Sequence, residues 1–174
     1  MARLIDDILN LSKIESGHLQ LIKRSCRLQP IVQSVLDGLA KQILAKNLTV
    51  KNAIAENTPL VIADEDRMAQ VILNLIDNAV KYTPENGNIL ISSQDKGPVV
   101  QVNVADTGMG IPAEDLPRVF ERFYRVDKAR SRDLGGTGLG LAIVKHIVQA
   151  HYGEVFVASH VGQGSTFSFT IPKA

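Results

Sequence analysis

The sequence is poor in residues that mark several protein classes. Its 174 residues include one cysteine, no tryptophan and only 5% aromatic residues. A single cysteine, Cys26, excludes an intrachain disulfide and a cysteine-rich zinc site, and it suits the reducing cytoplasm. Because aromatic residues are scarce while 45% of the residues are hydrophobic, we expect one domain of ordinary size with an aliphatic core.

Long apolar runs and an excess of one charge are also absent. No run approaches the ~20 apolar residues that span a bilayer, and the charged start MARLIDDILN is not typical of a signal peptide. Lys and Arg number 19 against 18 for Asp and Glu, a formal net charge of +1. This balance argues against general binding to nucleic acid or to an anionic membrane. We therefore expect a soluble cytoplasmic domain, although a longer protein containing it could be membrane-anchored.

The hydrophobic pattern predicts a mixture of helices and strands. Helices are expected over residues 4–21, 30–46, 64–83, 113–125 and 138–152, and strands over residues 48–54, 88–93, 99–105, 155–159 and 166–171. The helix over 4–21 starts with no cap and resembles the cut end of a longer helix. The polar, glycine-rich stretch at 126–137 is expected to be a mobile loop.

Several well-known motifs are missing. No glycine precedes a lysine as a Walker A loop requires, GGTGLGL does not fit GxGxxG, and there is no HRD, DFG or HExxH motif. The histidines, His18, His146, His151 and His160, lack metal-ligand spacing and are predicted to lie on the surface.

The helix over 64–83 carries an unusual polar stripe. Asn74, Asn78 and Lys81 fall within about 60° of arc. Such a stripe could be merely the solvated face, but asparagine is a mediocre helix former and is not typical of one. An amide oxygen suits Mg²⁺ when nucleotide phosphates supply the negative ligands, and Lys81 could meet phosphate charge. Tyr82 offers a flat face to a base.

The segment DTGMGIP (106–112) directly follows a predicted strand. It could be only a tight turn, for which an aspartate and two glycines are ordinary. Alternatively it forms an adenine pocket, in which Asp106 accepts a hydrogen bond from the exocyclic amine and Gly108 and Gly110 let the backbone approach the base. A buried aspartate would reject guanine, which has a carbonyl at that position.

Two further segments could contact phosphate. The glycines of GGTGLGL (135–141) stand before a helix N-terminus, where free N–H groups and the helix dipole favour an anion, although such glycines are often only hinges. Arg125 precedes the loop at 126–137 and could reach a terminal phosphate. A solvated surface arginine is an equally good interpretation of Arg125.

Taken together, these segments resemble the ATP-binding catalytic domain of bacterial sensor histidine kinases. The resemblance covers almost the whole chain and rests on the N box, three glycine boxes and the F box, found here as NLIDNAVKYTP (74–84), DTGMGIP (106–112), FERFYRVD (120–127), GGTGLGLAIVKHIV (135–148) and GQGSTFSFTIP (162–172). It implies the Bergerat ATP-binding fold. That fold is a two-layer α+β sandwich with a mixed, mostly antiparallel sheet, helices on one face and a lid, here at 126–137.

The resemblance also implies roles for individual residues. Asn78 would hold Mg²⁺, with Asn74 beside it at the phosphates, and Lys81 and Arg125 would position the phosphates for catalysis. The adenine would be contacted by Tyr82, Asp106, Gly108, Gly110, Ile111 and Thr166. The phosphates would be wrapped by Gly136, Thr137, Gly138, Leu139 and Gly140.

One position separates branches of the superfamily. The gyrase, Hsp90 and MutL ATPases carry a glutamate one turn before the Mg²⁺-binding asparagine, and here that position is Asn74. An amide cannot accept a proton at neutral pH, so water activation should be poor, which favours a kinase over a hydrolase. An ATPase of the gyrase type and a docking module that needs no nucleotide remain as alternatives.

The resemblance extends to the N-terminal segment. Residues 1–24 look like the end of the dimerisation and phosphoacceptor hairpin, without its H box, and residues 25–174 like the catalytic domain. His18 lies at the wrong end of the hairpin to be the acceptor, so this fragment alone is not expected to autophosphorylate. The implied partners are its own phosphoacceptor hairpin and a response-regulator receiver domain, the full-length protein being a homodimer, with no nucleic acid and no membrane contact by this fragment.

Overall fold

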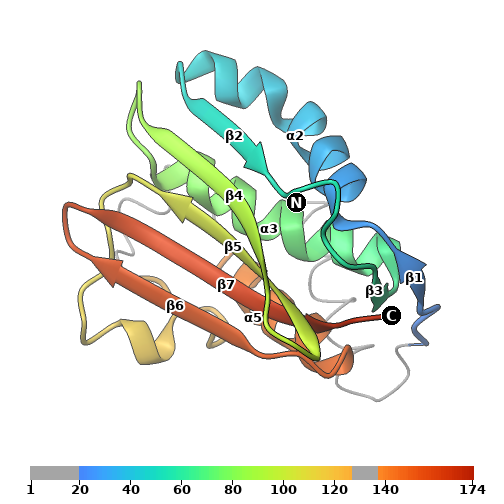
Figure 1. Cartoon of the computed structure of the whole chain (residues 1–174). Helices are drawn as coiled ribbons and strands as arrows, with labels where there is room; N and C mark the ends of the chain where they lie inside the picture. Colours follow the sequence, from blue (N-terminus) through green and yellow to red (C-terminus); the bar gives the residue numbers. More distant parts are fainter. Residues whose placement is uncertain (1–19, 127–136) are drawn as a thin grey trace.

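The computed structural model describes residues 20–126 and 137–174. Most of the helix predicted over 4–21 and nearly all of the loop predicted over 126–137 lie outside the described residues. The described part forms a two-layer α+β sandwich, with the three long helices on one face of the main sheet (Figure 1). No described helix is long and apolar enough to cross a membrane.

The main sheet has five strands in the order β2-β4-β5-β7-β6. Strands β2 (Thr49–Ala53) and β4 (Asn88–Asp95) are parallel, whereas β5 (Val99–Asp106), β7 (Gly164–Pro172) and β6 (Val155–His160) join by antiparallel pairings. Parallel neighbours need a crossover, and α3 (Glu65–Tyr82) lies in the one between β2 and β4. The predicted fold class, a mixed and mostly antiparallel sheet with helices on one face, is confirmed.

Side-chain alternation along the strands separates the core from the outer face. In β5, Val100, Val102 and Val104 are buried towards the helices, while Gln101 and Asn103 lie on the opposite face, where the Gln101 amide donates to Asn103 Oδ1 at 2.7 Å. The buried hydrophobic residues of the core are aliphatic apart from Cys26, Met68, Phe167 and Phe169. The predicted aliphatic core is therefore confirmed.

Both ends of α3 are fixed by side chains. At its start the Asp64 carboxylate accepts a hydrogen bond from the N–H of Arg67 at 3.1 Å. At its end the Lys46 ammonium donates to the carbonyl oxygens of Val80, Lys81 and Thr83 at 2.7, 3.0 and 2.6 Å. A cation at this end complements the helix dipole as well as satisfying carbonyls without a helical partner. Lys46 thus fixes the helical turn that carries Lys81.

The other helices differ in part from the prediction. Helix α2 (Leu28–Ala45) begins two residues before Pro30, which lies inside its first turn. Helix α5 (Gly140–Ala150) is close to its predicted range. The helix predicted over 113–125 is wrong: only a 3₁₀ turn, η1 (Leu116–Arg118), forms there, and Phe123 has a φ of 59°, which no right-handed helix accommodates.

A second, two-stranded sheet was not predicted. It pairs β1 (Arg24–Cys26) with β3 (Val61–Ala63) in antiparallel register. Each strand has three residues, too few for an alternating pattern to be recognised. This small sheet attaches residues 24–26 to the segment that leads into α3.

His151, predicted to lie on the surface, is buried. Its Nε2 accepts a hydrogen bond from the N–H of Asp64 at 3.0 Å, and its Nδ1 lies 2.8 Å from the carbonyl oxygen of Ile147. The carbonyl can only accept, so Nδ1 carries the proton and the ring is neutral. Burial lowers the pKa of His151. The side chain therefore joins the end of α5 to the start of α3.

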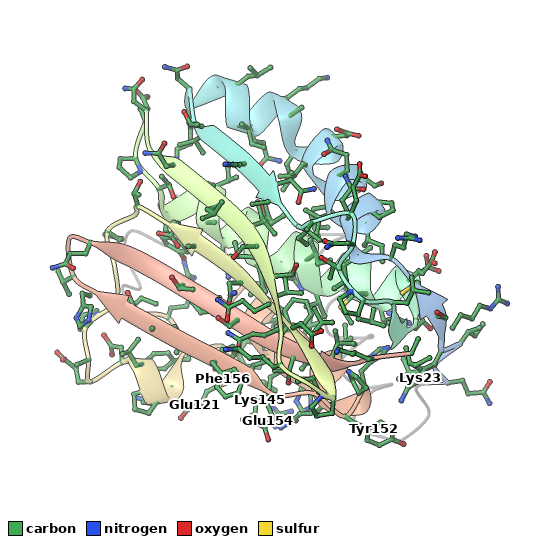
Figure 2. All side chains as sticks on the ribbon, in the orientation of Figure 1. Lys23, Glu121, Lys145, Tyr152, Glu154 and Phe156 are labelled. Carbon is green, nitrogen blue, oxygen red and sulfur yellow. The ribbon has the colours of Figure 1, made fainter. Side chains whose placement is uncertain are left out.

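The segment before β1 is attached at the same place. The N–H of Ile22 donates to Asp64 Oδ2 at 2.9 Å. Lys23 Nζ donates to the carbonyl of Ala150 at 2.8 Å and lies 4.1 Å from the centre of the Tyr152 ring (Figure 2). Residues 22–26 are thereby attached to α3, α5 and β3.

Candidate functional site

A pocket of about 370 Å³ opens between the C-terminal half of α3, the end of β5, the segment 109–112 and the start of α5. Residues from separate predicted motifs line it: Asn74, Asn78, Lys81, Tyr82, Asp106, Gly110, Ile111, Arg125, Thr137, Gly138 and Gly140. These residues lie up to 66 positions apart in the sequence, from 74 to 140. The structure thus brings most of the predicted site residues together.

The remaining predicted residues are not among the described residues that line the pocket. Leu139 is fully buried behind it, and Gly108 contributes through its backbone, as shown below. Gly136 lies outside the described residues. Thr166 lies on the face of β7 opposite its neighbours Ser165 and Phe167, which do line the pocket. The expectation that Thr166 lines the base pocket is therefore wrong, because successive side chains of a strand point to opposite faces.

Asp106, the last residue of β5, is oriented by backbone groups. Its Oδ1 accepts hydrogen bonds from the N–H of Gly108 at 2.8 Å and from the N–H of Ser165 at 3.3 Å. No residue in the described part of the chain donates to Oδ2, which leaves this oxygen for a ligand. Burial raises the pKa of Asp106, and these two hydrogen bonds act in the opposite direction. The carboxylate is held as a fixed acceptor at one end of the pocket.

Two glycines make this arrangement possible. A Cβ on Gly108 would lie 2.6 Å from Asp106 Oδ1 and 2.7 Å from the carbonyl oxygen of Tyr82. Gly110 has a φ of 72°, and a Cβ there would collide with the carbonyl group of His160. Neither position tolerates a side chain without a shift of backbone, because the close neighbours are held by β5, α3 and β6.

At the other end of the pocket lie buried N–H groups with no acceptor. Asn74 Nδ2 and the Nε and Nη2 atoms of Arg125 are buried and have no hydrogen-bond partner among the described residues. A buried donor without an acceptor is costly, by about 1–3 kcal/mol. Because all of these donors belong to pocket residues, they fit a ligand that presents several acceptor oxygens, as a polyphosphate does.

Lys81 is already paired. Its Nζ lies 2.8 Å from Oδ2 of Asp77, whose side chain is only 7% exposed. Asp77 also lines the pocket, so a carboxylate stands beside the predicted phosphate side. Asp77 is not among the predicted site residues, although its position one turn before Lys81 on the same helix indicates that the two can pair.

Other residues that line the pocket were also not predicted from the sequence. Met109 and Val161 are exposed apolar side chains at the pocket, and Phe167 closes it from β7. Tyr124 also lines the pocket, and its hydroxyl donates to Asp115. The apolar residues 167, 169 and 171 alternate along the last strand, and this alternation already predicts that Phe167, not Thr166, faces the helices.

The protein residues alone do not form a metal centre. No group of three or more His, Cys, Asp or Glu side chains that could hold an ion occurs in residues 20–126 and 137–174. On α3, the metal-compatible oxygens at the pocket are the amide of Asn78, the neighbouring amide of Asn74 and the carboxylate of Asp77. This set fits Mg²⁺ only when a ligand supplies further oxygens, as Mg²⁺ bound through substrate phosphates requires.

Comparison with known sequences places the chain in a family. Residues 63–174 match the family model described as histidine kinase-, DNA gyrase B-, and HSP90-like ATPase. The adaptive-response sensory kinase SasA of Gloeothece citriformis is 43% identical over 99% of this chain, and the sensor histidine kinase WalK of Bacillus subtilis is 39% identical over 99%. The chain spans 44% of the length of SasA and 28% of that of WalK.

Solved structures agree with this placement. Full-length ShkA in complex with AMPPNP superposes with a TM-score of 0.86 at 32% identity, covering 99% of this chain and 35% of ShkA. The histidine kinase ThkA in complex with the response regulator protein TrrA gives a TM-score of 0.77 at 27% identity, covering 99% of this chain and 49% of ThkA. The chain therefore belongs to the family of histidine kinase-, DNA gyrase B- and HSP90-like ATPases, and it is an ATP-binding domain of the sensor histidine kinase kind.

Proposed function

We propose that the pocket binds Mg·ATP and presents the γ-phosphoryl group to a histidine outside the catalytic domain. The observation that carries the proposal is a set of buried N–H donors, on Asn74 and Arg125, that have no acceptor among the described residues and share the pocket with the carboxylate of Asp106. Phosphate oxygens satisfy such donors. An adenine amine, which donates, suits the free oxygen of Asp106.

The adenine would be held by Asp106, Gly110, Ile111 and Tyr82, which line the same pocket. Oδ1 of Asp106 is occupied by two N–H groups, so Oδ2 would accept from the exocyclic amine. Replacing the amine by the carbonyl of guanine would set two acceptors against each other. The site would therefore select ATP over GTP.

The phosphates would lie between α3 and the start of α5. Arg125 and Lys81 would position them, and the backbone of Thr137, Gly138 and Gly140 would contact them. Asn78, with Asn74 beside it, would hold Mg²⁺ together with the phosphate oxygens. When bound, Mg²⁺ neutralises charge that develops on the transferring group.

Transfer to a histidine, and not to water, is favoured by the residue at position 74. The hydrolytic branches of the superfamily have a glutamate there as the base that activates water. The amide of Asn74 cannot take a proton, and loss of a general base costs about 10²–10⁴-fold in rate. ATP would then be held in line for an attacking nitrogen brought by another part of the protein.

The whole protein would be a protein-histidine kinase. We infer that residues 1–24 end the hairpin that carries the acceptor histidine in a homodimer, and that the phosphoryl group passes to an aspartate of a receiver domain. The structure of ThkA with the response regulator TrrA supports a partner of that kind. This arrangement suits a domain in the cytoplasm, where ATP is available.

Two measurements test the proposal. Calorimetry of this chain with ATP and GTP should show Mg²⁺-dependent binding of ATP only. Radiolabelled ATP mixed with this chain and the phosphoacceptor hairpin should give acid-labile phosphate on the hairpin. Multiple-turnover release of inorganic phosphate would instead favour an ATPase, and failure to bind any adenine nucleotide would favour a docking module.

A further inference from the structure

We propose that Asp77 makes nucleotide binding depend on Mg²⁺, because its carboxylate cancels the charge of Lys81 inside the pocket. The inference rests on the proposed function, since it assumes that the pocket binds a nucleotide. It concerns a residue other than the predicted metal ligand, Asn78, and assigns it a part in choosing Mg·nucleotide over the free nucleotide.

The contact between the two side chains is close and shielded from water. Lys81 Nζ lies 2.8 Å from Asp77 Oδ2, and the side chains are 22% and 7% exposed. Asp77 precedes Lys81 by one helical turn, so the pair forms whenever α3 is folded. Lys46 holds the carbonyl of Lys81, which fixes this turn of the helix from the other side.

The charges at the pocket cancel. The charged side chains among its described lining residues are two carboxylates and two cations, Asp77, Asp106, Lys81 and Arg125. Their formal sum is zero. Described lining residues that sum to zero charge attract a free nucleotide weakly, because each anionic group of the ligand meets as much negative as positive charge from them. A bound Mg²⁺ supplies the missing positive charge.

The ion pair with Lys81 does not by itself explain a carboxylate at this position. An i,i+4 ion pair on a helix stabilises it by only a few tenths of a kcal/mol, and burying a charge has a cost. Asp77 also stands on the same helix as Asn74 and Asn78, where it would repel phosphate. The place of Asp77 in the pocket is explained if its carboxylate disfavours the Mg-free nucleotide and favours the Mg·nucleotide complex.

The test compares ADP affinity with Mg²⁺ and with a chelator, by calorimetry on the whole chain. ADP is chosen because it has no γ-phosphoryl group to transfer. In Asp77→Asn, removal of the negative charge should tighten Mg-free binding by about tenfold or more. The affinity for Mg·ADP should increase less, since the substitution also removes a negative charge that attracts Mg²⁺. The dissociation constant of Mg-free ADP divided by that of Mg·ADP should therefore fall, by up to about tenfold.

A control separates the local effect from net charge. Asp37→Asn makes the same chemical change on α2, at an exposed residue paired with Gln33 and outside the pocket lining. It should leave the ratio unchanged. A merely structural role of Asp77 would weaken both affinities together and would also leave the ratio unchanged, so an unchanged ratio in Asp77→Asn overturns the proposal.

A second variant covers the case in which Asp77→Asn does not fold. Lys81→Gln leaves the carboxylate uncompensated, so Mg-free binding should weaken more than Mg·ADP binding and the ratio should rise; a fall or no change contradicts the inference. If the unmodified chain binds no ADP or ATP with or without Mg²⁺, the proposed function itself fails. If the unmodified chain binds nucleotide but the variants leave the ratio of dissociation constants unchanged, only the role of Asp77 is refuted.

Discussion

Lowering the pH below about 6.5 should destabilise the domain through His151. The ring is neutral in the fold, because Nε2 accepts from the N–H of Asp64 and Nδ1 donates to the carbonyl of Ile147. Protonation of Nε2 would turn it into a donor, so that two N–H groups, of the ring and of the Asp64 backbone, would point at each other with no acceptor between them. Lys23, whose charge also opposes protonation, and Asp64, whose charge favours it, are the charged groups that act on the ring.

The sign and size follow from proton linkage. Burial lowers the pKa of His151 in the folded state, whereas an unfolded chain has the ordinary value near 6.5. Between these two values the unfolded state binds a proton that the folded state does not. The stabilisation is complete above about pH 6.5 and is lost as the pH falls, by at most about 1.4 kcal/mol per pH unit. Between neutral pH and pH 5.0 the loss is at most about 2 kcal/mol, a large part of the 5–15 kcal/mol typical of a domain.

Urea unfolding followed by circular dichroism from pH 5.0 to 7.5 measures this effect. His151→Gln is the matched variant, since the amide oxygen of Gln can accept from Asp64 and does not titrate. We expect the free energy of unfolding to fall more steeply below pH 6.5 in the unmodified chain than in the variant. The Asp64 carboxyl does not interfere: burial raises its pKa, but hydrogen bonds from Ile22 and Arg67 outweigh this and hold it below 3.8. Parallel pH profiles for the two proteins would refute the reasoning.

Three substitutions test the site and its support. Asp106→Asn should abolish ATP binding in calorimetry, because an amide can present a donor to the adenine amine; retained micromolar affinity would contradict the adenine assignment. Asn78→Ala should remove most of the increase in nucleotide affinity that Mg²⁺ causes, because Mg·nucleotide binding weakens while Mg-free binding does not tighten. An equal effect of Mg²⁺ on both proteins would contradict the metal assignment. Lys46→Met should lower the free energy of unfolding by about 2 kcal/mol in urea titrations, because carbonyls at the end of α3 lose a charged donor; a change below about 0.5 kcal/mol would show that water replaces it.

The sequence could predict the polar face of α3 because one regular helix carries it. Asn74, Asn78 and Lys81 follow from the 3.6-residue period alone, and the structure places all three at the pocket. The same period places Asp77 beside them, although an acidic residue is not expected where phosphate binds. The helical period therefore identifies Asp77 as a neighbour of the other three residues, whereas the expected chemistry of phosphate binding does not.

Other features depend on contacts that no local pattern contains. The helix expected over 113–125 has suitable apolar spacing at Phe120 and Phe123. The N–H of Phe123, however, donates to the carbonyl of Gly138 at 2.9 Å, and its φ of 59° ends any helix. A tertiary hydrogen bond to a distant loop thus overrides local preference. The two short strands β1 and β3 form for a similar reason, since each exists only against the other.

The burial of His151 is the clearest case of a long-range effect, and it bears on how the domain is held. Asp64 and His151 lie 87 positions apart, so neither predicts the other. Their contact joins the start of α3 to the end of α5, and both helices reach the pocket about 15 Å further on, at Asn74 and at Gly140, with a rise of 1.5 Å per residue. Ile22 and Lys23 are attached at the same junction. These hydrogen bonds therefore connect the segment before β1 directly to the two helices that form walls of the pocket.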